Sequence, residues 1–65
     1  MLADVRKELK ELMGHSVEVH TKQATKISGT LSWLSPDFSM AELTSKDGEI
    51  KTVTDVQIKS IRKIS

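Results

Sequence analysis

The spacing of the apolar residues changes at Gly14, and this change limits the chain to one helix followed by strands. Before Gly14, apolar residues recur at steps of three and four with charged residues between them, the period of a one-sided helix. After it, Val17 and Val19 alternate with polar residues, the period of a half-buried strand. We therefore expect a helix over residues 2–13 that ends at Gly14, where a left-handed residue is favoured.

Turn-forming residues divide the rest of the chain into further strands. Ser35-Pro36-Asp37 has turn chemistry, and Asp47-Gly48 is a strong hairpin signal. The last segment has a helix as its rival interpretation, but its apolar residues are β-branched, which favours a strand with a bulge. The five predicted strands cover residues 16–21, 25–34, 38–44, 50–54 and 58–64.

A glycine within the second predicted strand indicates how the sheet closes. Gly29 lies in the middle of this strand, where glycine usually marks a bulge or a sharp bend. A strand bent in this way can belong to both halves of a barrel. The sequence therefore predicts a single domain over residues 1–65, mainly β, with an N-terminal helix followed by a strongly bent, five-stranded antiparallel SH3-like open barrel.

Strand alternation predicts whether the large apolar side chains near the second turn face the core or the solvent. Trp33 has the same parity as Leu31, so we expect it in the core. Phe38 and Met40 share their parity with Glu42, a poor core residue. Either a bulge changes the facing after Met40, or Phe38 and Met40 point outward, where they would need a partner.

The length and composition predict a thin core and no metal or cofactor. A chain of 65 residues buries only about 60% of the surface that its unfolded form exposes. The absence of cysteine excludes disulfides and thiolate metal sites, and His15 and His20 have no acidic partners at ligand spacing. Association of subunits through free strand edges is the remaining source of stability, so we expect a homo-oligomer.

Membrane and enzymatic functions have no support in the sequence. No stretch approaches the roughly 20 apolar residues of a membrane span, and the N-terminus lacks a signal peptide, so we expect a cytoplasmic protein. There is no nucleophile-elbow serine motif, glycine-rich phosphate loop or paired-histidine zinc motif. We therefore expect no catalytic residues and no small-molecule substrate.

The formal net charge of +1 conceals two oppositely charged segments. Residues 36–49 carry four carboxylates against one lysine, a net charge of −3. Residues 50–65 carry four cations against one carboxylate, a net charge of +3. Basic residues clustered at one end of a small domain can attract phosphate, although they can also be the solvated face of a strand.

The segments at residues 9–19, 27–31, 37–40 and 56–61 together resemble the Sm/LSm/Hfq superfamily. The match spans nearly the whole chain, but the distance from Gly29 to Asp37 is longer than in the family by about two or three residues. Ala41 stands where eukaryotic members have an RNA-contacting asparagine, nothing matches the Arg-Gly of the second motif, and Thr54-Asp55 stands near the bacterial Lys-His. The resembling segments are L-K-E-L-M-G-H-S-V-E-V (residues 9–19), I-S-G-T-L (27–31), D-F-S-M (37–40) and V-Q-I-K-S-I (56–61).

This resemblance implies a ring-forming RNA scaffold or chaperone. Family members form closed rings of about five to seven subunits in which the fourth strand of one subunit pairs with the fifth strand of the next. The resemblance and the charge pattern together suggest RNA contacts at Asp37, Phe38, Lys59, Arg62 and Lys63. The corresponding subunit-interface residues are Met40, Lys51, Val53, Ile58 and Ile61.

The competing hypothesis is a protein-interaction module without nucleic-acid binding. An SH3-like barrel of another family would satisfy most of the same pattern. Such a barrel would present Phe38 and Met40, or the helix face, to a protein partner, and its basic C-terminal segment would serve solubility. Phe38 itself has two interpretations, a base-stacking residue or an aromatic of the core or subunit interface.

Overall fold

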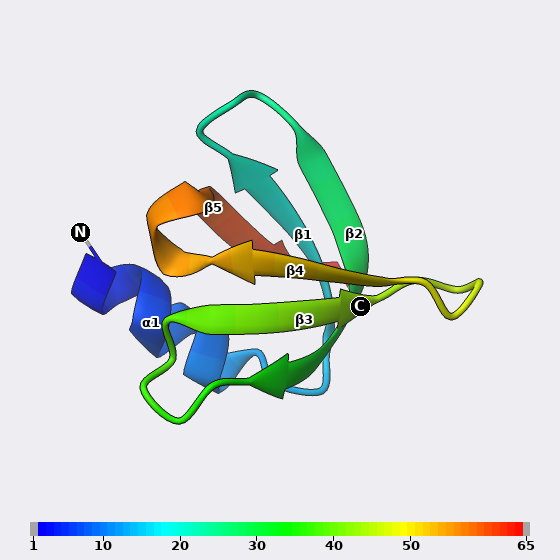
Figure 1. The fold of residues 1–65 in the computed structure, drawn as a ribbon, viewed down its shortest axis with the longest axis horizontal. Helices are drawn as coiled ribbons and strands as arrows, with labels where there is room; N and C mark the ends of the chain where they lie inside the picture. The colour runs from blue at the N-terminus through cyan, green and yellow to red at the C-terminus, as the bar shows by residue number, and fades with distance from the viewer. Residues whose placement is uncertain (1, 65) are drawn as a thin grey trace.

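The computed structural model describes residues 2–64, which form one helix and a curled five-stranded sheet (Figure 1). All neighbouring strands are antiparallel, in the order β4-β3-β2-β1-β5. The predicted fold class, a helix followed by a five-stranded antiparallel open sheet, is confirmed. The elements are α1 (Leu2–Glu11), β1 (Ser16–Thr21), β2 (Lys26–Leu34), β3 (Met40–Thr44), β4 (Ile50–Thr54), the 3₁₀ helix η1 (Asp55–Gln57) and β5 (Ile58–Lys63).

The end of α1 is attached to the sheet through Gly14. Gly14 adopts a φ of +85°, the left-handed conformation expected where a helix ends. Its amide donates to the carbonyl of Leu31 over 2.8 Å, and the amide of Leu31 donates to the carbonyl of His15 over 3.0 Å. The helix is therefore bonded to the middle of β2 and lies across one end of the curled sheet (Figure 1).

The core is a single cluster formed by the inward positions of all five strands and one helical residue. Leu9 of α1 is 1% exposed and packs within the apolar side chains of the sheet. Val5 on the helix and Leu12 in the turn directly after it are half-buried and pack against this cluster. The buried apolar residues are Leu9, Val17, Val19, Leu31, Ala41, Leu43, Val53, Ile58 and Ile61.

A bulge in β2 reverses the direction of Trp33. Leu31 pairs with Leu43, but Trp33 pairs with Glu42, so Ser32 is an extra residue between the two pairs. The extra residue shifts the alternation of the strand, and Trp33 is 41% exposed on the outer face. The expectation that Trp33 belongs to the core was wrong because parity predicts facing only where no bulge intervenes.

Met40, but not Phe38, follows the second of the two alternatives. Ala41 and Leu43 are buried, whereas Met40 points outward and is 41% exposed. Phe38 lies in the turn before the strand, with a left-handed φ of +61°. Met40 therefore occupies the outer face of the sheet, and the position of Phe38 is set by the turn instead of by strand alternation.

Candidate interaction surfaces

Asp37 holds together the turn between β2 and β3. Its Oδ1 accepts hydrogen bonds from the Ser35 hydroxyl at 2.9 Å, the Ser39 hydroxyl at 2.7 Å and the Ser39 amide at 3.1 Å. The bonds from the Ser39 and Ser35 hydroxyls, in that order, lower the pKa of Asp37 to about 2. The observed role of this predicted RNA-contact residue is therefore to stabilise its own turn.

Phe38 lies next to α1. Its side chain is half-buried, and the Nζ of Lys10 lies 5.9 Å from the centre of its ring, within the range of a cation–π contact. The adjacent amide of Ser39 is anchored as described above. Phe38 is consequently part of the contact between the turn and the helix, and one face of its ring is covered by a cation.

The predicted basic contacts on β5 do not form one patch. Both Nε and Nη2 of Arg62 lie 3.0 Å from Oε1 of Glu18 on the outer face of β1. Lys59 and Lys63 are exposed and, among residues 2–64, form no ion pair. They stand near opposite ends of the strand, about 13 Å apart along it. The structure thus separates these lysines from each other and engages Arg62 elsewhere.

Glu18 is the centre of a charged cluster on the outer face of β1. Besides Arg62, it contacts Nε2 of His20 at 2.9 Å and Nζ of Lys26 at 3.9 Å. The hydrogen bond with His20, followed by that with Arg62, lowers the pKa of Glu18. The outer face of the β2–β1–β5 half of the sheet is therefore strongly polar.

The predicted subunit-interface residues divide into two groups. The side chains of Val53, Ile58 and Ile61 are buried in the chain's own core, whereas Met40 and Lys51 are exposed. Within the described part of the chain, β4 pairs only with β3, and β5 pairs only with β1. A partner strand would therefore meet the backbone of β4 or β5 and not these buried side chains.

The outer face of the β2–β3–β4 half is largely uncharged. Trp33 lies opposite Glu42, and Met40 is two residues from Glu42 on the same face, so Trp33 and Met40 are diagonal neighbours. Glu42 is the only ionisable residue in this row. We call this surface the Trp33–Met40 face; it comprises Trp33, Met40, Glu42, Thr52 and Thr54.

Sequence reasoning identified only part of this face. The shared parity of Met40 and Glu42 left an outward Met40 as one of two alternatives, and no signal in the sequence marked the bulge at Ser32 that turns Trp33 to the same side. The bulge results from the pairing of β2 with β3, so it depends on residues that are distant in sequence.

An ion pair that the sequence did not suggest joins α1 to η1. Asp55 is 4% exposed, and its Oδ2 accepts from the Nε of Arg6 at 2.7 Å. Its backbone amide donates to the carbonyl of Ser39 at 2.9 Å. The helix, the 3₁₀ turn and the turn before β3 therefore meet at this carboxylate.

Among residues 2–64, no group of three or more His, Cys, Asp or Glu side chains is arranged to hold a metal ion. Over the same residues, no helix has the length and apolar character needed to cross a membrane.

Comparison with known proteins supports the fold. Neither a protein-family model nor a curated protein matches the chain. A solved structure described as "Structural basis of the Dcp1:Dcp2 mRNA decapping complex activation by Edc3 and Scd6" contains a similar chain, with a TM-score of 0.75 and 21% sequence identity. The alignment covers 88% of this chain but only 59% of the length of that one. At this identity the likeness establishes a small β-rich fold, and membership of the Sm superfamily stays a prediction.

Proposed function

We propose that this chain is a protein-interaction module without catalytic activity, which binds its partner through the Trp33–Met40 face and the adjacent edge of β4. The observation that carries the proposal is the position of two large apolar side chains, each 41% exposed, on one face of neighbouring strands. Exposed apolar side chains that gather beside a free strand edge are typical of a surface that a partner covers. Glu42 is the single carboxylate between them.

The partner is an extended segment that adds to β4 as a further strand. The free edge of β4 offers backbone donors and acceptors to such a segment. Its outward side chains would lie beside Thr52 and Thr54, and Met40 lies one strand further into the sheet. Residues 36–49 carry a net charge of −3, which favours a segment containing lysine or arginine. The structural neighbour comes from an assembly whose description names four proteins, which supports a protein partner for a fold of this kind.

Amide NMR spectra provide a direct assay of the β4 edge. A synthetic peptide of alternating lysine and isoleucine serves as the probe. We expect saturable shifts of the amide signals of residues 50–54, because the added strand would bond to that edge of the sheet. A peptide of the same sequence with alternate backbone amides methylated should not bind, since it cannot complete the strand hydrogen bonds.

A matched pair of methionine variants tests the location of the site. Met40 is 41% exposed on the proposed face, and Met13 is 44% exposed in the turn after α1. Met40→Ala should weaken peptide binding by about threefold to tenfold, within the range of a single interface side chain, and Met13→Ala should leave it unchanged. Equal effects of the two substitutions, or no saturable shift of the β4 amide signals with the peptide, would refute the proposal.

A second candidate function is the Sm-like ring that binds RNA. The observation that favours it is that β4 and β5 are the two edge strands of the sheet. β5 carries Lys59, Arg62 and Lys63, and the acidic residues of β3 and of the β3–β4 hairpin lie next to β4. Pairing β4 of one copy with β5 of the next would repeat around a closed ring.

Solution mass and RNA binding test this candidate separately from the first. At tens of micromolar, light scattering should give a mass several times the 7.2 kDa of one chain, and a monomeric mass would exclude the ring. Single-stranded U-rich and A-rich RNA should bind in low salt, and Lys59→Ala combined with Lys63→Ala should weaken binding and its salt dependence. Unchanged RNA affinity in this double variant would remove the assigned contacts.

A further inference from the structure

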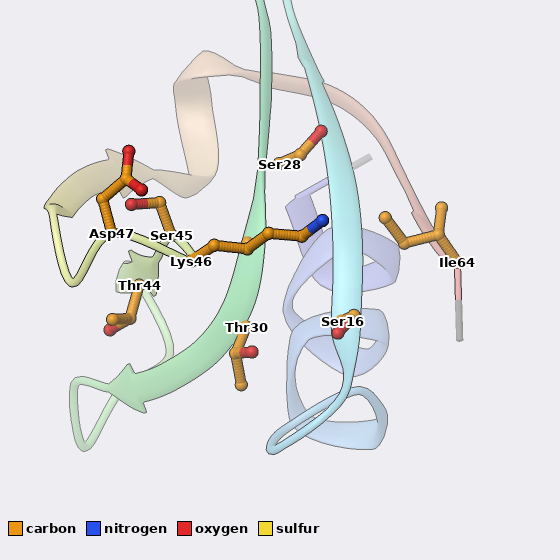
Figure 2. Close-up of a pocket in the computed structure, with 9 residues that line it drawn as sticks. Ser16, Ser28, Thr30, Thr44, Ser45, Lys46, Asp47 and Ile64 are labelled. Carbon is orange, nitrogen blue, oxygen red and sulfur yellow. The ribbon is translucent and has the colours of Figure 1, made fainter.

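A hollow on the outer face of the sheet lies where the hairpin between β3 and β4 approaches β2 (Figure 2). Its volume of about 450 Å³ falls within the range of roughly 300–1,000 Å³ that is typical of small-molecule sites. Five of its nine lining residues carry hydroxyl groups, and they come from β1, β2 and the end of β3 with the residue that follows it. None of the lining residues belongs to the Trp33–Met40 face.

Three of these hydroxyl groups are free to bind a ligand. Within the described part of the chain, the side chains of Ser16, Ser28 and Thr30 take part in no hydrogen bond. The other two hydroxyls are engaged, since the Thr44 Oγ1 pairs with the Ser32 hydroxyl and the Ser45 Oγ accepts from the Glu49 amide. Each free hydroxyl can donate one hydrogen bond into the hollow.

Lys46 supplies a positive charge to the same place. Figure 2 shows its side chain extending from the hairpin across β2, while the carboxylate of Asp47 points away from it. The Lys46 ammonium has no ion-pair partner among residues 2–64. One unopposed cation surrounded by hydroxyl donors matches an oxyanion, and the only carboxylate in the lining is directed elsewhere.

We propose that this hollow binds the phosphate group of a small phosphorylated molecule, with Lys46 as the counter-charge and Ser16, Ser28 and Thr30 as hydrogen-bond donors. The donors come from two strands and the cation from a hairpin, so they approach from different directions. A tetrahedral phosphate has oxygens in several directions, whereas a carboxylate has two in one plane. The volume exceeds that of a phosphate ion, so the remainder holds the organic part of the molecule.

Titration followed by amide NMR spectra tests the site. The probes are inorganic phosphate and glycerol 3-phosphate, with sodium chloride at the same ionic strength as the control. We expect saturable shifts centred on residues 16, 28–30 and 44–47, at millimolar or lower concentration, and tighter binding of the ester. Lys46→Met should weaken binding by about tenfold or more, as expected when a charge-assisted contact is lost. Lys22→Met, at an exposed lysine in the turn after β1, should have no effect.

Other outcomes overturn specific parts of the proposal. The absence of saturable shifts, or equal losses in the Lys46 and Lys22 variants, would show that phosphate interacts with the surface charge in general. Equal affinity for the two probes would remove the organic part of the ligand from the proposal. Ser28→Ala with Thr30→Val offers a second test at exposed or half-exposed positions, and unchanged affinity would exclude these hydroxyls as donors. Peptide binding at the Trp33–Met40 face is measured on other residues, so the two proposals can fail independently.

Discussion

Replacement of Gly29 by alanine should destabilise the protein through one backbone contact. A Cβ atom at Gly29 would lie 2.7 Å from the carbonyl oxygen of Thr44 and 3.0 Å from its carbonyl carbon. Both are backbone atoms at the end of β3, so no flexible side chain can move aside. Reaching an ordinary contact of about 3.4 Å requires β2 and β3 to separate by about half an ångström or more.

The cost of this shift can be bounded. Overpacking in a well-packed site costs about 1–3 kcal/mol, and replacing glycine within a strand returns about 0.5–1 kcal/mol. The difference runs from about 0 to about 2.5 kcal/mol, and we expect a loss of unfolding free energy near its centre, about 1 kcal/mol. A domain of this size has a total stability of only about 3–10 kcal/mol and should lose roughly 4–8 °C of melting temperature per kcal/mol.

Urea unfolding monitored by circular dichroism measures the effect, and two variants serve as comparisons. Ser28→Ala, at the exposed neighbouring position, should change the unfolding free energy by less than about 0.5 kcal/mol. Gly48→Ala introduces a Cβ that meets nothing within 4 Å but has a φ of +84°, so its cost of about 1–2 kcal/mol reflects backbone conformation alone. If Gly29→Ala unfolds at the same urea concentration as the parent chain, the argument from the Thr44 contact is wrong.

Three further predictions concern the core, the buried ion pair and pH. Leu9→Ala should lower the unfolding free energy by about 2–5 kcal/mol in the same urea assay, because removal of a side chain that is only 1% exposed leaves a cavity between the helix and the sheet. A loss below about 1 kcal/mol would contradict the central position of Leu9 in the core. Asp55→Asn should lower the unfolding free energy by about 1–3 kcal/mol. This is less than the loss expected on breaking a fully buried ion pair, because the Arg6 side chain is 42% exposed. A double-mutant cycle with Arg6→Met should show that the two substitutions are coupled. The folded-state pKa of Asp37, about 2, lies below the ordinary aspartate value of 3.8, so its contribution to stability is complete above pH 3.8 and is lost as the pH falls through 2. Between pH 5 and 2, the unfolding free energy measured in urea should decrease less for Asp37→Asn than for the parent chain.

The helix and the strands were predictable because their signals are local. The change of apolar period at Gly14, the turn at Pro36 and the Asp47-Gly48 hairpin located the elements to within about two residues. Each of these signals depends on neighbouring residues, whose conformations are limited by their own backbone chemistry. The direction of Met40 was left open between two alternatives, since alternation within β3 did not reveal whether a bulge was present.

The candidate surfaces were less predictable because they depend on how the strands are paired. Trp33 lies on the outer face because of the bulge at Ser32. Arg62 forms an ion pair with Glu18 on β1. The Arg6–Asp55 pair joins residues 49 positions apart. The residues that neighbour each of these side chains in the sequence do not indicate which distant residue it contacts.

The sequence by itself determined that this chain is one helix followed by five strands with a bent sheet, because periodicity, turn chemistry and the glycine in the second strand are properties of adjacent residues. Only the tertiary structure decided which side chains share a surface: the uncharged Trp33–Met40 face, the charged cluster around Glu18 and the hydroxyl-lined hollow beside Lys46. The physical reason is that strand register and bulges, which a one-residue shift would reverse, are set by contacts between segments distant in sequence.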